Sequence, residues 1–344
     1  MPASRPSDPP AQPPRVAVLT LGGTIGMVAE PGGGGLRPAL SAAALLASLD
    51  NLDAVADLQV TEIMNRPSPH LSFDDLRDVA QKASQALAAG AAGVVVVQGT
   101  DSIEVTAFAL DLLAGSAAPI VVTGAMRGAQ LPGADGPANL SAAIRVAAAR
   151  RCRDLGALVV MNDEIHAARY VVKGHSSNPA AFVSDPGPIG RLVEGEPQVL
   201  LRPPRLDAAV LAPDSAATAR PTRVFHIAAE IDDDGALVRA ALETGCEGLV
   251  VSGMGGGHVA PAMVAVLEAA AARLPVVLTT KCPGGGVLAR TYGYAGAEID
   301  LAARGLVRAG LLTPSKARAA LVLLLRAGQS LPAIRGFFSA FGGG

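Results

Sequence analysis

Short runs of apolar, β-branched residues alternate along the chain with longer Ala- and Leu-rich segments in which apolar positions recur at helical spacing. A parallel strand covered by helices on both faces is continuously apolar, and residues 93–97, Gly-Val-Val-Val-Val, have this pattern. The alternation therefore predicts an α/β fold with a mostly parallel sheet flanked by helices. In the first half of the chain we expect strands at 15–21, 58–64, 93–97, 119–123 and 157–161. We expect helices at 41–49, 74–89 and 138–150, and a further helix that follows residues 98–101 and ends near 114.

The pattern breaks down after residue 205, where the chain becomes rich in Pro, Arg, Asp and Ser, as linkers are. We therefore expect a larger N-terminal domain over 15–205, a linker over 206–222 and a smaller C-terminal α/β domain over 223–344. Residues 1–14 are polar and Pro-rich, which predicts a disordered leader. In the C-terminal domain we expect strands at 224–228, 248–251 and 276–279 and a final helix at 314–327.

The composition is globular and argues against nucleic-acid binding. Of the 344 residues, 50% are hydrophobic and 17% are charged. The 28 Lys and Arg residues against 30 Asp and Glu residues leave a net charge of -2, without the positive excess that binding to phosphates requires. Aromatic residues, at 3% and without tryptophan, offer few platforms for base stacking. We expect no nucleic-acid partner.

The chain also lacks membrane and export signals. Its longest apolar stretch, 261–280, is interrupted by Glu268, Arg273 and Pro275 and is too short to span a bilayer. The N-terminus has neither the basic start nor the apolar run of a secretory signal. These features predict a cytoplasmic protein without a membrane partner. Only four basic residues are lysines, and the Arg, Ala and Gly enrichment indicates a GC-rich genome, for which we expect an actinobacterial source.

The three cysteines, Cys152, Cys246 and Cys282, lie far apart in the sequence. Their number is odd, no C-x-x-C occurs, and no histidine lies at ligand spacing, so neither a disulfide framework nor a zinc site is indicated. We interpret them as buried thiols and expect no metal.

Small, hydroxylated and acidic residues gather in four loops near the ends of predicted strands. Ligands of open parallel sheets bind outside the carboxyl ends of the strands, so these loops are expected to converge on one site. The glycines before Thr24 and Thr100 let the backbone approach a ligand closely, and the two hydroxyls are possible nucleophiles. The four loops are 22–24, 67–69, 99–101 and 124–127.

A threonine hydroxyl needs a base, and a lysine whose pKa is lowered by burial can act as one. Lys173, in a polar loop after the strand at 157–161, could reach Thr100 and Asp101. Alternatives remain open for each residue: Lys173 as a surface lysine, Thr24 and Thr100 as helix caps, and Asp101 as a first-turn carboxylate that complements the helix dipole.

Three motifs, in register, resemble those of the bacterial-type L-asparaginase/glutaminase family. They are Leu-Gly-Gly-Thr-Ile at 21–25, Gly-Thr-Asp-Ser at 99–102 with Glu104, and Val-Thr-Gly-Ala-Met-Arg at 122–127. Further similarity at Asp135, Asn139 and 312–318 extends the resemblance over nearly the whole chain.

The resemblance implies a larger N-terminal and a smaller C-terminal α/β domain, assembled as a homodimer or a homotetramer, with no cofactor or metal. It implies hydrolysis of the side-chain amide of L-asparagine to L-aspartate and ammonia, with the preference for L-asparagine over L-glutamine left open. Thr24 matches the nucleophile that forms the acyl-enzyme. Thr100, Asp101 and Lys173 match the threonine, aspartate and lysine of a second catalytic group.

The same resemblance implies the substrate-binding residues. Asp101 would bind the α-ammonium group and Ser68 the α-carboxylate, while backbone N–H groups near Thr100 and Ala125 would stabilise the oxyanion. Gly23 and Gly99 would line the same site, to which His258 and Glu298 of a partner subunit would also contribute.

Several positions depart from the family pattern. The family places a tyrosine on the loop after the first threonine, whereas this chain has no tyrosine before Tyr170. His258 replaces an asparagine that in many members reaches the partner subunit's site; a lone histidine in a glycine loop is otherwise most often solvated or hydrogen-bonded. Leu21, Gln98 and Val105 also differ from the usual residues. Two alternatives therefore stay open: an amidase of this fold acting on another amide or peptide, and a non-catalytic sensor of Asp or Asn.

Overall fold

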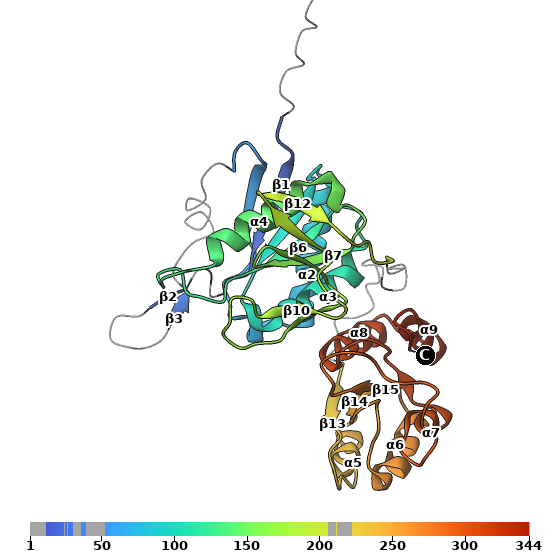
Figure 1. Ribbon diagram of the computed structural model, residues 1–344. Coiled ribbons are helices and arrows are strands. Elements are labelled where there is room, and N and C mark those ends of the chain that lie inside the picture. Colours follow the sequence, from blue (N-terminus) through green and yellow to red (C-terminus); the bar gives the residue numbers. More distant parts are fainter. Residues whose placement is uncertain are drawn as a thin grey trace, which may run out of the picture.

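The computed structural model describes residues 12–23, 25, 27–29, 36–38, 52–205, 211 and 222–343. Figure 1 shows two α/β units, a larger one from the N-terminal part of the chain and a smaller one from the C-terminal part. The α/β architecture expected from the sequence is confirmed. The helix expected at 41–49 and most of the expected leader and linker lie outside the described residues.

An eight-stranded sheet in the order β12-β11-β8-β7-β6-β5-β1-β4 forms the centre of the larger unit. Strands β4, β1, β5, β6 and β7 are parallel, while β8, β11 and β12 continue the sheet in antiparallel pairs. The strands are β1 (Arg15–Thr20), β4 (Asp57–Glu62), β5 (Gly93–Val97), β6 (Ile120–Thr123), β7 (Ala157–Met161), β8 (Glu164–Ala167), β11 (Gly190–Val193) and β12 (Glu196–Val199).

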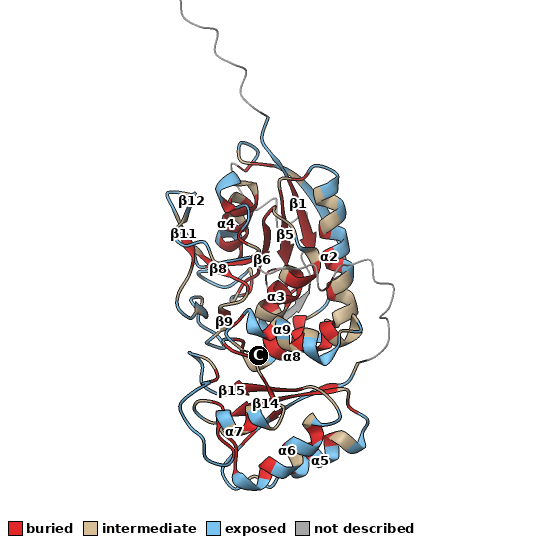
Figure 2. Ribbon diagram, turned by 90° about the vertical axis from the view of Figure 1, so that its right-hand side faces the viewer, coloured by how far each residue is buried: buried red, intermediate tan, exposed pale blue. Residues whose placement is uncertain are grey.

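Alternate residues of the central strands face two different helix layers. Val94 and Val96 of β5 pack in one apolar cluster with α2 and α3, whereas Val95 and Val97 pack with α4. Because both faces are covered, β5 is apolar at nearly every position, as a parallel strand in such a fold must be. Figure 2 shows the buried strands β1 and β5 between α4 and α2, whose outer faces are exposed. The helices are α2 (Phe73–Ala88), α3 (Ile103–Ala114) and α4 (Gly136–Ala148).

Two short hairpins lie outside this sheet. Strand β9 (Val171–Lys173) pairs with β10 (Phe182–Ser184), and β2 (Met27–Ala29) pairs with β3 (Leu36–Pro38), both antiparallel. The sequence pattern missed β8 to β12 because these strands are short and most are partly exposed, so they lack the continuous apolar run that marks β5.

The smaller unit has a four-stranded parallel sheet in the order β13-β14-β15-β16. Its first three strands match the expected ones to within two residues, and α8 matches the expected final helix, but α9 follows it and was not expected. The elements are β13 (Val224–Ala228), α5 (Ala236–Glu243), β14 (Gly248–Gly253), α6 (Val264–Ala271), β15 (Val276–Thr280), α7 (Glu298–Ala303), β16 (Val307–Arg308), α8 (Pro314–Arg326) and α9 (Leu331–Ser339).

Helix α8 joins the two units through a shared apolar core. Leu321 and Leu324 of α8 belong to the same cluster as Phe108 of α3 and Val250 of β14. In Figure 1, α8 accordingly lies between the larger unit and the sheet of the smaller one. An ion pair between Arg326 and Asp74 of α2, at 2.8 Å, adds a polar link across the same boundary.

The cysteine prediction was right for two residues and wrong for the third. Cys152 and Cys246 are buried, and burial raises the pKa of the Cys152 thiol to about 11. Cys282 is exposed, because it follows β15 in a surface turn rather than lying within the strand. Among the described residues, no group of three or more His, Cys, Asp or Glu side chains could hold a metal ion.

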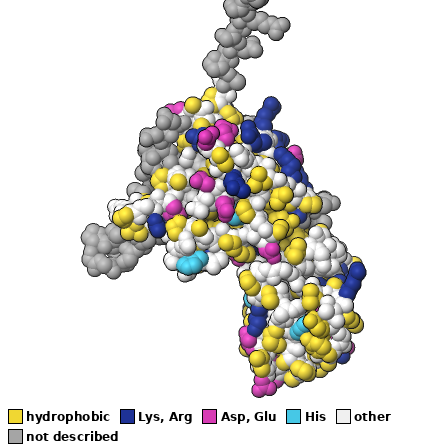
Figure 3. Space-filling view, in the orientation of Figure 1, with side chains coloured by type: hydrophobic (Ala, Val, Ile, Leu, Met, Phe, Trp, Pro, Cys, Tyr) yellow, Lys and Arg dark blue, Asp and Glu magenta, His cyan; other side chains and the backbone are white. Residues whose placement is uncertain are grey.

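Charges of both signs occur on the surface of both units. Figure 3 shows acidic and basic side chains over the larger and the smaller unit on the face drawn there. In the described part of the chain, none of the helices combines the length and the apolar character needed to cross a bilayer.

Candidate active site

The site forms where three neighbouring parallel strands end. β1, β5 and β6 lie side by side, and their carboxyl ends lead into three of the loops that the sequence singled out, 22–24, 99–101 and 124–127, of which residue 24 lies outside the described residues. The 3-10 turn η2 (Ser68–His70) packs against the turn η3 (Thr100–Ser102) and brings Ser68 beside Gly99. Thr24, the expected nucleophile, lies outside the described residues, so its place in the site stays a prediction.

Glycine is required at residue 23 for two reasons. Its φ of +104° lies in the region that side chains rarely adopt, and a Cβ there would overlap the backbone of Gly99. The loop after β1 therefore lies directly on the loop after β5. A larger residue at 23 would separate these two loops, and a larger residue at 99 would instead meet Ser68 of η2.

Lys173 connects the two polar groups of the turn after β5. Its Nζ donates to Thr100 Oγ1 at 2.8 Å and to Asp101 Oδ1 at 2.6 Å. Thr100 is buried and the Lys173 side chain is only 14% exposed, whereas the Asp101 side chain is 64% exposed. The sequence placed Lys173 in a polar loop; in the structure it is the last residue of β9, directly before that loop, and it reaches Thr100 and Asp101 as expected.

The helix-capping alternative does not hold for Thr100. Gly99 precedes η3, Ser102 precedes α3, and neither start has a side-chain cap. The Thr100 hydroxyl is instead engaged by Lys173, and the Asp101 carboxylate pairs with the same amine. The turn after β5 thus presents two of its three polar side chains, those of Thr100 and Asp101, to Lys173.

Glu104 is the residue whose part in the site the sequence did not reveal. Its Oε2 accepts the backbone N–H of Lys173 at 2.7 Å, although the two residues lie 69 positions apart. Glu104 lies in the first turn of α3, directly after the turn η3 that carries Thr100 and Asp101. The helix that follows these two residues therefore also holds β9, the strand that carries Lys173. Its place beside the Gly-Thr-Asp-Ser motif was the one available signal.

Ser68 is buried and is held through its backbone. Ser102 Oγ donates to the Ser68 carbonyl at 3.2 Å, and Gln98 Nε2 donates to Ser102 Oγ, also at 3.2 Å. Gln98, which departs from the family pattern, therefore bridges the end of β5 to η2. Its Oε1 is buried and has no hydrogen-bond partner among the described residues.

The loop at 124–127 is fixed by two residues of the family motif. The Asp135 carboxylate accepts the N–H groups of Met126 and Arg127, both at 2.9 Å. Asn139 Nδ2 donates to the Gly124 carbonyl at 3.0 Å. Ala125, the expected oxyanion-hole residue, is thereby held in a rigid segment and is completely buried.

An open pocket of about 360 Å³ adjoins the lysine. Its lining comes from the larger unit alone: Asp101, Glu104, Lys173, Gly174, His175 and Ser176. The volume suits a small molecule, and the charges on the lining suit a zwitterionic one.

His258 and Glu298 lie together in the smaller unit, where their described contacts are with each other and with nearby tyrosines. A carboxylate only accepts, so His258 Nε2–H donates to Glu298 Oε2 at 3.1 Å, and His258 Nδ1 is hydrogen-bonded to the Tyr294 hydroxyl at 2.9 Å. The structure does not bring this group to Lys173 within one chain.

Glu298 is fully engaged inside its own chain. Its side chain is 0% exposed, and its Oε1 accepts the N–H groups of Thr291 and Tyr292 at 2.9 and 2.8 Å. Burial alone would raise the pKa of Glu298, but the hydrogen bonds from Tyr292, Thr291 and His258 outweigh it and lower the pKa. Glu298 therefore presents no free oxygen to solvent, and the exposed end of the chain of hydrogen bonds is the Tyr294 phenol.

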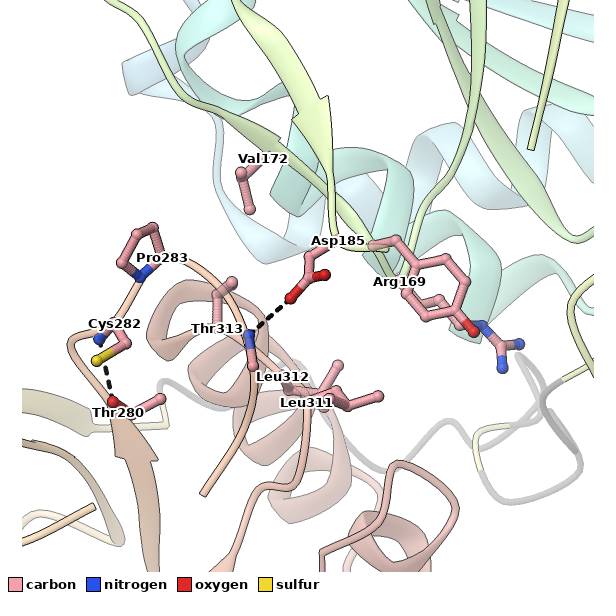
Figure 4. A pocket seen from close by; sticks show the side chains of 11 residues that line it. Arg169, Val172, Asp185, Thr280, Cys282, Pro283, Leu311, Leu312 and Thr313 are labelled. Atoms are coloured by element: carbon pink, nitrogen blue, oxygen red, sulfur yellow. Dashed lines mark hydrogen bonds between the residues drawn. The ribbon is translucent and has the colours of Figure 1, made fainter. Parts of the chain in front are cut away.

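A second crevice lies between the two units (Figure 4). Asp185 extends from the larger unit and accepts the N–H of Gly285 at 2.6 Å, while the Cys282 N–H donates to Thr280 Oγ1 at 3.0 Å. Its volume of about 20 Å³ admits a water molecule and excludes an amino acid. This crevice is a seam between the units and not a second substrate pocket.

A doubly covered α/β sheet with a threonine, a lysine and an aspartate bonded together at its strand ends is the arrangement of an asparaginase-type amidohydrolase. Two family models cover the chain: the one described as asparaginase, N-terminal, matches residues 15–205, and the one described as glutaminase/asparaginase C-terminal domain matches residues 223–338. The chain belongs to the asparaginase family.

Individual relatives agree with this assignment. The chain is 37% identical to a probable L-asparaginase of Deinococcus radiodurans, over 96% of this chain and 98% of the relative. It is 34% identical to an L-asparaginase of Bacillus licheniformis, over 90% and 95%. The crystal structure of a probable cytoplasmic L-asparaginase from Campylobacter jejuni superposes with a TM-score of 0.86 at 29% identity, covering 95% of this chain and 99% of that one. The actinobacterial source stays a prediction.

Proposed function

We propose that this protein hydrolyses the side-chain amide of L-asparagine to L-aspartate and ammonia through a threonine acyl-enzyme. The observation that carries the proposal is the pair of hydrogen bonds from Lys173 Nζ to Thr100 and Asp101. A protein that only bound aspartate or asparagine would have no need of a lysine amine hydrogen-bonded to a buried threonine hydroxyl. This hydrogen bond argues against the sensor alternative.

The reaction has two steps. Thr24 attacks the amide carbon and ammonia leaves, which forms an ester between the Thr24 oxygen and the aspartyl group. Water then attacks this ester, with its proton taken up by the group of Thr100, Lys173 and Asp101, and L-aspartate is released. Backbone N–H groups near Thr100 and Ala125 stabilise the negative oxygen in both steps, at about 3 kcal/mol per donor.

The two charged ends of the amino acid orient it. Asp101, the most exposed carboxylate beside Lys173, binds the α-ammonium group. The Ser68 hydroxyl binds the α-carboxylate, and the close backbones of Gly23 and Gly99 form the floor of the site.

The test is ammonia release from L-asparagine by the wild type and by the Thr24→Ala and Lys173→Ala variants. The matched control is Lys281→Ala, which removes a lysine paired with Glu230 in the smaller unit. We expect activity in the wild type and the control and its loss in the other two. A folded wild type that releases no ammonia would contradict the proposal and direct the search to another amide or peptide, or to the sensor alternative. L-glutamine in the same assay measures the preference.

The active enzyme is expected to be a cytoplasmic homodimer or homotetramer. A second copy would bring His258 to the open side of the pocket next to Lys173. The exposed Tyr294 would lie beside His258, and the buried Glu298 would lie behind it. The hydrogen bonds that hold His258 on two sides support a defined position for its ring.

A further inference from the structure

Lys316 is a buried lysine for which the proposed reaction has no use. It lies in the first turn of α8, and none of its surface is exposed. An amine in such surroundings is unfavourable unless it is well hydrogen-bonded. Its Nζ donates to the carbonyl of Arg169, at 3.2 Å, and to that of Val171. A side chain of the smaller unit thus binds the backbone of the larger one.

The two carbonyls belong to the segment that carries the active-site lysine. Val171 begins β9 and Lys173 ends it, so the two residues are separated by about 7 Å of extended chain. At the far end of the strand, the Lys173 N–H donates to Glu104 of α3. β9 is therefore held at both ends, by α8 at its start and by α3 at its end.

Lys316 can donate to the carbonyls of Arg169 and Val171 whether its amine is charged or neutral. Burial lowers the pKa of Lys316 to about 7, and the charge of Glu104 partly opposes this change. The charge of Lys316 also acts on His166 of β8: burial, with a smaller contribution from Lys316, lowers the pKa of His166 to about 4. Neutral or charged, the Lys316 amine keeps at least the two N–H donors that two carbonyls require.

We propose that Lys316 is a positioning residue: by holding the carbonyls of Arg169 and Val171, it fixes β9 and so places Lys173 Nζ between Thr100 and Asp101. The inference rests on the proposed function, in which the group of Thr100, Lys173 and Asp101 takes up the proton of the attacking water. If it holds, the group of Thr100, Asp101 and Lys173 in the larger unit is correctly assembled only when the smaller unit is docked against it.

The first test compares Lys316→Met with Arg326→Met. Both residues are on α8 and both link it to the larger unit, but Arg326 binds Asp74 of α2 and has no described contact with β9. A displacement of Lys173 by about 1 Å is expected to lower kcat by about 100-fold. We therefore expect this loss in Lys316→Met with KM little changed, and wild-type kcat in Arg326→Met. Equal losses in both variants would overturn the inference, because they would indicate general weakening of the domain contact.

A second test does not depend on turnover. The chain has four lysines, so protein labelled with ¹³C at lysine Cε gives four assignable signals. We expect Lys316→Met to shift the Lys173 signal and Arg326→Met to leave it in place. An unmoved Lys173 signal in folded Lys316→Met would overturn the inference, whereas failure of the wild type to release ammonia would overturn the proposed function instead.

If Lys316→Met does not fold, Lys316→Gln replaces it in both tests. The glutamine amide keeps N–H donors on a side chain one atom shorter, so it should pull β9 toward α8 and give a smaller kcat loss with a shifted Lys173 signal. Wild-type kcat together with an unshifted signal in this variant would overturn the inference.

Discussion

The backbone N–H of Lys173 donates to the Glu104 carboxylate at 2.7 Å, across 69 residues of sequence. Glu104 lies in the first turn of the helix that follows Thr100 and Asp101, and Lys173 Nζ donates to those two residues. The three active-site groups are thus joined in a closed ring of hydrogen bonds that runs through backbone and side chains.

Removal of the Glu104 carboxylate is expected to loosen this ring. In Glu104→Ala the Lys173 N–H loses its acceptor, and we expect a loss of about 1 kcal/mol in the free energy of unfolding together with a fall in kcat. Glu104→Gln keeps an oxygen acceptor and should lose less of both. Urea denaturation and steady-state kinetics measure the two effects, and equal behaviour of the two variants would contradict this role.

Removal of the Ser68 hydroxyl is expected to weaken substrate binding. Ser68→Ala should raise KM about 10-fold, because one hydrogen bond to a charged group is lost, and should change kcat less. Ser72→Ala is the matched control, since Ser72 caps α2 in a capping box with Asp75. It should cost about 1 kcal/mol of stability and leave KM unchanged. Unchanged KM in Ser68→Ala would remove Ser68 from the binding site.

Burial of His166 predicts a loss of stability in acid. Burial lowers its pKa to about 4, although Glu164 Oε2 lies 3.4 Å from its ring. As the pH falls from about 6.5 to about 4, the unfolded chain takes up a proton that the folded protein does not, so the folded state loses up to about 3 kcal/mol. Urea denaturation across this range should show the loss in the wild type and a smaller one in His166→Gln. Identical pH profiles would contradict the assignment.

Mixing two inactive variants tests whether the site is shared between subunits. Lys173→Ala disables the larger unit, and His258→Ala disables the group that we expect the partner to supply. In a mixed dimer one of the two sites then combines intact units, so a refolded equal mixture should recover about a quarter of the wild-type activity. If the mixture is no more active than the separate variants, each chain completes its own site. Full activity of His258→Ala alone would show that the histidine is not needed.

The sequence by itself determined the fold class and much of the site. Continuous apolar runs such as 93–97 are typical of strands with both faces covered, and β1, β5, β7 and β14 begin where the pattern predicts. The glycine and threonine motifs mark strand ends, and parallel strands end on one edge of a sheet. For this reason the convergence of Gly23, Ser68 and Thr100 could be expected before any coordinates.

Only the tertiary structure decided how the site is held together. β9 is three residues long and carries no apolar run, so the strand that positions Lys173 has no local signal. Glu104 and Lys316 lie 69 and 145 residues from the β9 groups that they bind. The motif beside Glu104 marks that residue, but nothing in the local sequence shows that either side chain binds β9. The burial of Glu298 behind His258 has the same origin, because hydrogen bonding and exposure depend on which distant segments meet when the chain folds.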